Sequence, residues 1–118
     1  MGRRSRRRGA EPLAAAESPY EDAEGSVLVL RGAMTPATRA EYAKVRAGGL
    51  NQEDAWQRSV EFLFERLAVR WEIAGTDPIE RQRDLLARYR FAGGDERAWI
   101  RDVLRSHLAA HFPDLDAP

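Results

Sequence analysis

The chain has 118 residues, equal numbers of basic and acidic side chains (19 of each), and no cysteine. This length suits one domain with its own core, and the lack of thiols excludes disulfides, thiol catalysis and cysteine-ligated metals. No apolar run approaches the roughly 18 residues that cross a bilayer, so we expect a cytoplasmic protein with no membrane partner.

Residues 1–24 predict a disordered charged arm. They show no hydrophobic periodicity, contain two prolines, and carry a basic block followed by an acidic block. A segment of this kind cannot bury enough apolar surface to offset the entropy of ordering it. The basic block consists of Arg3, Arg4, Arg6, Arg7 and Arg8.

Residues 26–31 (Ser-Val-Leu-Val-Leu-Arg) give the one strand signal, a short aliphatic run closed by Gly32. A lone strand cannot satisfy its own backbone groups. We therefore expect it to pair with a partner chain, pair with itself across a dimer, or lie extended against helices.

Four helices are predicted after this strand, over residues 36–47, 52–74, 78–91 and 96–112. Thr35, Asn51, Asp77 and Asp95 are candidate N-caps, and glycines or Pro113 follow the helix ends. The fold class that we expect is mostly α: a single four-helix domain over residues 25–118, with one short extended segment and the disordered arm.

The predicted helix 52–74 is the most apolar and carries two apolar sides. One continuous stripe runs from Trp56 to Ala74 at helical spacing, and Phe62, Val69 and Ile73 form a second patch. A surface helix needs only one apolar face. This helix is therefore either central in the bundle or partly committed to a partner.

His107 and His111 have the i, i+4 spacing that can present two imidazoles to one metal, but no third ligand is evident and Leu108 stands where a metalloprotease motif needs glutamate. Packing of both rings is the favoured interpretation. We find no nucleophile elbow, phosphate-binding glycine loop or catalytic carboxylate pair. The sequence thus predicts no enzyme, no metal and no cofactor.

The order of a short strand, a small helix and a long helix that ends in Val-Arg-Trp-Glu-Ile-Ala-Gly (residues 69–75) resembles the tail-assembly chaperones of siphophages. The resemblance covers about residues 26–75. It implies a non-catalytic protein that binds a tail-tube or tape-measure subunit before assembly. Packing of Trp71 in a core explains the same motif without a family relationship.

We therefore expect a small non-enzymatic protein-interaction module, such as an assembly chaperone or adaptor, that contacts another protein or a second copy of itself. The expected contact residues are Val27, Val29, Phe62, Val69 and Ile73, because the strand lacks a partner and the helix 52–74 carries an apolar patch beyond the one face that packing requires. The alternative is a nucleic-acid-associated accessory or regulatory protein that uses the five arginines of the arm. The sequence defines neither the partner nor a reaction.

Overall fold

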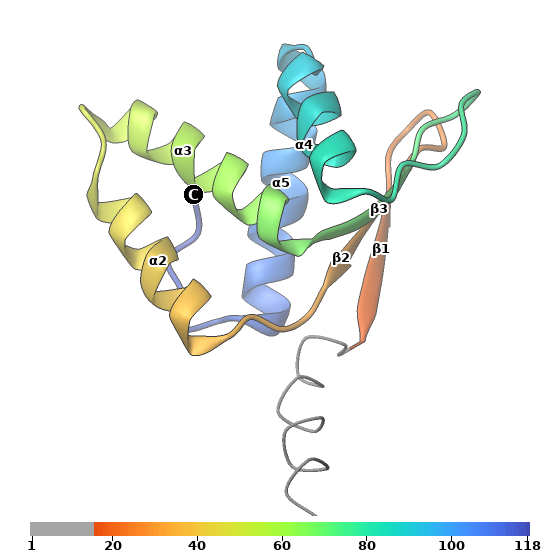
Figure 1. Cartoon of the computed structure of the whole chain (residues 1–118). Helices are drawn as coiled ribbons and strands as arrows, with labels where there is room; N and C mark the ends of the chain where they lie inside the picture. Colours follow the sequence, from red (N-terminus) through yellow and green to blue (C-terminus); the bar gives the residue numbers. More distant parts are fainter. Residues whose placement is uncertain (1–15) are drawn as a thin grey trace, which may run out of the picture.

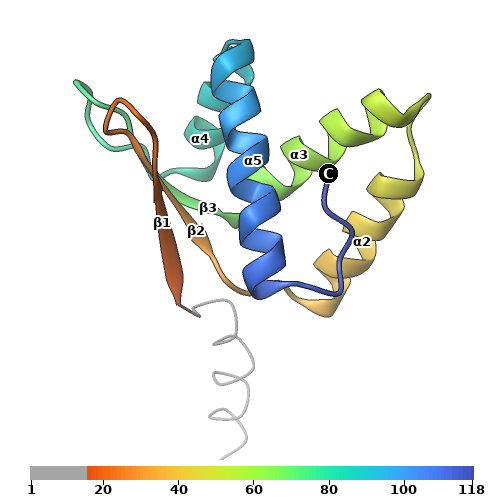
Figure 2. The same cartoon turned by 180° about the vertical axis from the view of Figure 1, so that it is seen from behind.

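A computed structural model describes residues 16–118 (Figure 1). Its elements in chain order are β1 (Glu17–Glu21), β2 (Val27–Arg31), α2 (Pro36–Ala47), α3 (Gln52–Leu67), β3 (Ala68–Glu72), α4 (Gln82–Phe91) and α5 (Gly94–His111). The strands form one antiparallel sheet in the order β1-β2-β3. Figures 1 and 2 place the helices together on one side of this sheet.

The expectation of a helical domain with one extended segment is wrong, because the segment at residues 26–31 is the central strand of a three-stranded sheet. Its backbone groups bond to β1 on one side and to β3 on the other. The strand therefore needs no second chain to satisfy them. The described domain is mostly α with a small sheet.

The predicted helix 52–74 is also wrong beyond Leu67, where the chain turns into β3. Residues 69–73 alternate between apolar and charged side chains, which is the period of a strand, but Trp71 and Ala74 also fit the helical stripe. Backbone pairing with the neighbouring β2 favours the strand over the helix. The motif that carries the chaperone resemblance thus lies mostly in a strand rather than at a helix end.

Glu17–Glu21, predicted within the disordered arm, form the edge strand β1. Pro19 in their middle argues against a central strand, but an edge strand accepts proline where its nitrogen points away from the sheet. The backbone bonds from Gly32 to Ala16 and from Asp22 to Ser26 show that the backbone N–H and C=O groups of even-numbered residues in β1 point toward β2. The backbone nitrogen of Pro19 therefore points to the outer edge of the sheet. Residues 1–15, with the five arginines, lie outside the described residues.

The capping predictions have mixed outcomes. The helix 36–47 is confirmed, with Thr35 accepting from the Thr38 amide at 3.1 Å, and Asn51 likewise caps α3 through the Asp54 amide at 2.8 Å. Asp77 and Asp95 are not N-caps, because α4 begins at Gln82 and α5 already begins at Gly94. Asp77 instead lies in the segment between Trp71 and Ile79, which pair with each other through an isolated bridge.

The core lies between the inner face of the sheet and the helices. Leu28 and Leu30 of β2 are fully buried, as are Leu63 of α3 and Leu104 of α5. Trp71 of β3 packs at 5.5 Å, centroid to centroid, against Phe64 of α3. Among residues 16–118, no helix combines the length and the apolar character needed to span a membrane.

The alternation along β2 predicts unequal costs for neighbouring substitutions. Leu28→Ala should lower the free energy of unfolding by about 3 kcal/mol, because it leaves a cavity in the core. Val29→Thr should cost less than about 1 kcal/mol, because its side chain is half-exposed and keeps its β-branch. Urea unfolding measures both values, and equal costs would contradict the assigned faces of β2.

Candidate functional site

The side of the sheet that faces away from the helices is the first candidate surface. We define this outer face by the outward side chains of the three strands: Glu17, Pro19, Glu21, Val27, Val29, Arg31, Arg70 and Glu72. Their strand partners pair in register, with Val27 between Glu21 and Glu72, and Val29 between Pro19 and Arg70. The same strands direct buried or partly buried residues such as Leu28 and Tyr20 toward the helices.

Val27 and Val29, two of the expected contact residues, form the apolar centre of the outer face. Both are half-buried, and the exposed Pro19 lies beside them. Charged groups surround this centre: Arg70 pairs with Glu72 at 2.6 Å and also with Glu80, whereas Arg31 has no ion pair within residues 16–118. The outer face therefore has the layout of an apolar centre with a charged rim.

Local chemistry disfavours the addition of a further strand at both edges of the sheet. On the β3 side, the Trp71 amide and carbonyl both bond to Ile79, at 2.9 Å each. On the β1 side, Pro19 offers no donor and Glu17 and Glu21 add charge, which are common ways of blunting an edge. Contact through the face of the sheet is thus favoured over strand addition.

The five expected contact residues do not form one surface. Val69 lies where the register between β2 and β3 shifts, and Ile73 packs partly buried against the core. Phe62 belongs to a different part of the molecule, on α3 next to α2. Its ring packs 6.2 Å from Tyr42 and lies under the Arg66 guanidinium at 4.6 Å. Phe62 therefore has partners within its own chain.

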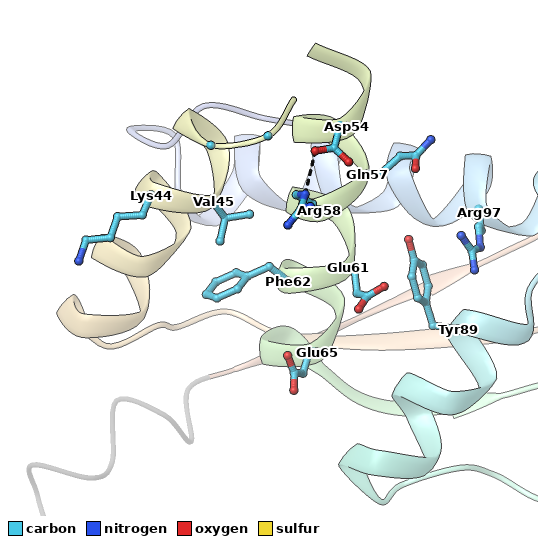
Figure 3. A pocket seen from close by; sticks show the side chains of 12 residues that line it. Lys44, Val45, Asp54, Gln57, Arg58, Glu61, Phe62, Glu65, Tyr89 and Arg97 are labelled. Atoms are coloured by element: carbon cyan, nitrogen blue, oxygen red, sulfur yellow. Dashed lines mark hydrogen bonds and ion pairs between the residues drawn. The ribbon is translucent and has the colours of Figure 1, made fainter. Parts of the chain in front are cut away.

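A groove of about 590 Å³ runs past Phe62 and forms the second candidate (Figure 3). Its walls come from α2, α3, α4 and α5, with Lys44, Arg58 and Arg97 as basic groups. The acidic groups are Asp54, Glu61 and Glu65.

Several charges of the groove are already engaged. Asp54 accepts from the Leu50 amide and binds Arg58 at 2.8 Å, and these contacts hold the pKa of its carboxyl below the usual value. Glu61 binds Arg90 at 2.6 Å. With balanced and partly paired charges, the groove presents no field that favours one ligand class.

The two histidines of α5 contact β1 rather than a metal. His107 is fully buried, with Nδ1 at 2.7 Å from the Tyr20 hydroxyl and Nε2 at 2.8 Å from the Arg31 carbonyl oxygen. His111 Nε2 lies 3.2 Å from Ser18 Oγ, and the two imidazole centroids are 4.5 Å apart. Within residues 16–118, no three His, Asp or Glu side chains come together as a possible metal site.

Sequence reasoning missed the two partners of these histidines. A helical i, i+4 pair rises about 6 Å, and a strand i, i+2 pair advances about 6.8 Å, so the two spacings match. Ser18 and Tyr20 show that strand spacing, but they lie about 90 residues away from the histidines in the chain. Ser18 and Tyr20 alternate with the charged or proline residues Glu17, Pro19 and Glu21, and this strand-like pattern is the signal that could have indicated them.

Comparison of the chain with protein-family models, with curated proteins and with solved structures gives no match. The function must therefore be argued from the chain's own geometry.

The buried histidine predicts a pH dependence of stability. Burial lowers the pKa of His107, against an opposing contribution from the Arg31 carbonyl, and His111 lowers it further. The folded state thus takes up this proton at lower pH than the unfolded state, so stability is complete above about pH 6.5 and falls below it. Urea unfolding between pH 7.5 and 5 measures this loss. A His107→Gln variant with the same pH slope would contradict the assignment.

Proposed function

We propose that this chain is a small non-enzymatic protein-interaction module that binds its partner through the outer face of the sheet. The partner that fits this surface is a polypeptide segment with basic and apolar side chains. The observation that supports the proposal is the half-exposed Val27–Val29 centre, on a sheet whose edges disfavour further strands and whose other face is packed by helices.

The composition of the outer face agrees with that of protein interfaces, which combine an apolar centre with a polar rim. Val27 and Val29 lie in the central strand, so both neighbouring strands hold their backbone in place. A partner would therefore meet a preformed surface. This limits the entropy that binding must offset.

The charges indicate a cationic partner. β1 and the turn after it carry four carboxylates and no basic residue: Glu17, Glu21, Asp22 and Glu24. None of them has an ion pair within the described part of the chain. Complementary charge steers association and selects among partners, and its effect weakens as salt increases.

The size of the sheet indicates a weak or transient complex. Five-residue strands extend about 17 Å, and the outer strands are about 10 Å apart. This area is smaller than the roughly 800 Å² that each partner contributes to a standard interface. We therefore expect micromolar or weaker affinity, unless the partner also contacts the acidic turn at residues 22–25.

A role as an assembly chaperone or adaptor in the cytoplasm is the form of this proposal that the resemblance to tail-assembly chaperones suggests. The alternative, nucleic-acid association, depends on Arg3 to Arg8, which lie outside the described residues. The unpaired carboxylates of the outer face, Glu17 and Glu21, outnumber its unpaired Arg31, which disfavours a phosphate backbone. The described residues thus favour a protein partner over a nucleic acid.

Substitution of Val27 by lysine gives a specific test. The new side chain lies between Glu21 and Glu72, so the fold should tolerate it. The outer face, however, loses apolar area and becomes less negative, because lysine adds a positive charge. Affinity capture should recover a partner with the wild-type chain and lose it with Val27→Lys. Titration of the purified partner should then show at least about tenfold weaker binding and a salt dependence.

Ala109→Lys is the matched control, because it adds the same charge at an exposed position of α5. It should bind like the wild type. Equal capture by the wild type and Val27→Lys would contradict the proposed surface, and light scattering would show whether the captured partner is a second copy of the chain.

A further inference from the structure

Two polar contacts and the partly buried ring of Tyr20 attach the edge strand β1 to the helical layer. Ser18 and Tyr20 are its inward side chains, and they bond to His111 and His107 of α5. We name these four residues the histidine clasp. By contrast, the inward residues of β2 are two fully buried leucines.

The clasp fits a neutral His107. The Arg31 carbonyl oxygen can only accept, so Nε2 must carry the hydrogen of the ring. In a neutral imidazole Nδ1 is then an acceptor, and the Tyr20 hydroxyl donates to it. Every polar atom of the ring is satisfied in this state, although the ring is fully buried.

A second proton on His107 disrupts this arrangement of hydrogen-bond donors and acceptors. Nδ1 would become a donor aimed at the Tyr20 oxygen, and the hydroxyl would have to turn its own hydrogen away. The new positive charge would be buried, with the His111 ring centroid at 4.5 Å. Burial of an uncompensated charge is among the most costly changes in a protein interior.

The surroundings offer no compensating negative charge. The groups that face His107 are Tyr20 from β1, the Arg31 carbonyl at the end of β2, His111 on α5 and the Phe112 ring at 6.0 Å. No ion pair within residues 16–118 involves either histidine. A protonated ring must therefore reach water in order to have its charge solvated.

We propose that the histidine clasp is a pH-sensitive switch, in which protonation of His107 releases β1 from the helical layer while β2, β3 and the helices remain folded. Release of β1 is the smallest movement that hydrates His107, because Tyr20 covers the ring and β1 lies at the edge of the sheet. The other groups around the ring are His111 on the same helix, the Arg31 carbonyl at the end of the central strand, and Phe112, which belongs to the buried core. Local opening of this kind is typical of elements with few apolar contacts.

One consequence concerns the outer face and rests on the proposed function, whereas the switch itself does not. β1 contributes Glu17, Pro19 and Glu21 to that face. Its release would remove much of the negative charge beside Val27 and Val29. Acidification would then weaken binding of a cationic partner.

Amide hydrogen exchange of the full chain, measured by NMR and corrected for intrinsic rates, tests the switch. The Gly32 amide bonds to the Ala16 carbonyl and reports on the start of β1, whereas the Trp71 amide bonds to Ile79 and reports on the opposite edge. Each proton that only the open form takes up raises the equilibrium constant for opening by up to about tenfold for each unit by which the pH falls. From pH 7.5 to 5, Gly32 protection should fall at least about tenfold, with Trp71 changing less than about threefold.

A His107→Gln variant should keep Gly32 protection nearly independent of pH, because its amide can bond without taking up a proton. If the variant does not fold, the wild-type His107 ring resonances provide the test, since their titration must coincide with the loss of Gly32 protection. Equal losses at Gly32 and Trp71 would mean global unfolding and overturn the switch, as would no loss at either amide. These outcomes do not depend on any partner, so they are distinct from a failure of the capture experiment.

Discussion

Burial of the inner side of β2 is the constraint on which the rest of the structure depends. Leu28 and Leu30 are completely shielded, and their burial brings the sheet against α3 and α5. A strand held at this depth must bond on both sides, because unpaired backbone groups are costly away from water. β1 and β3 supply these bonds, although they are separated in the chain by two helices.

The same constraint produces the candidate surface. Side chains alternate along a strand, so burying Leu28 and Leu30 obliges Val27 and Val29 to point outward. A slip of one residue would exchange the two sets and place Arg31 in the core, which fixes the register. The apolar centre of the outer face is thus a consequence of how β2 is held. The outward side chains can still be replaced without changing the core.

Sequence reasoning succeeded where the signal was local and failed where two distant segments had to meet. Thr35 and Asn51 cap helices through residues three positions later, and helix 36–47 was correctly delimited. β3 was missed because Trp71 fits both a helical and a strand period, and only its pairing with Leu28 decides. β1 was missed because Pro19 and its charges resemble those of a disordered segment.

For the candidate site, the same reasoning selected Val27 and Val29 as contact residues on a premise that is wrong. Their exposure does not arise from a strand without a partner, since β2 is paired on both sides. Phe62 was grouped with them as excess apolar surface, yet Tyr42 and Arg66 of the same chain contact its ring. Apolar residues in a sequence therefore do not indicate a binding surface until their contacts within the chain are known. Here those contacts leave the middle of the outer face as the place where a partner has most to bury.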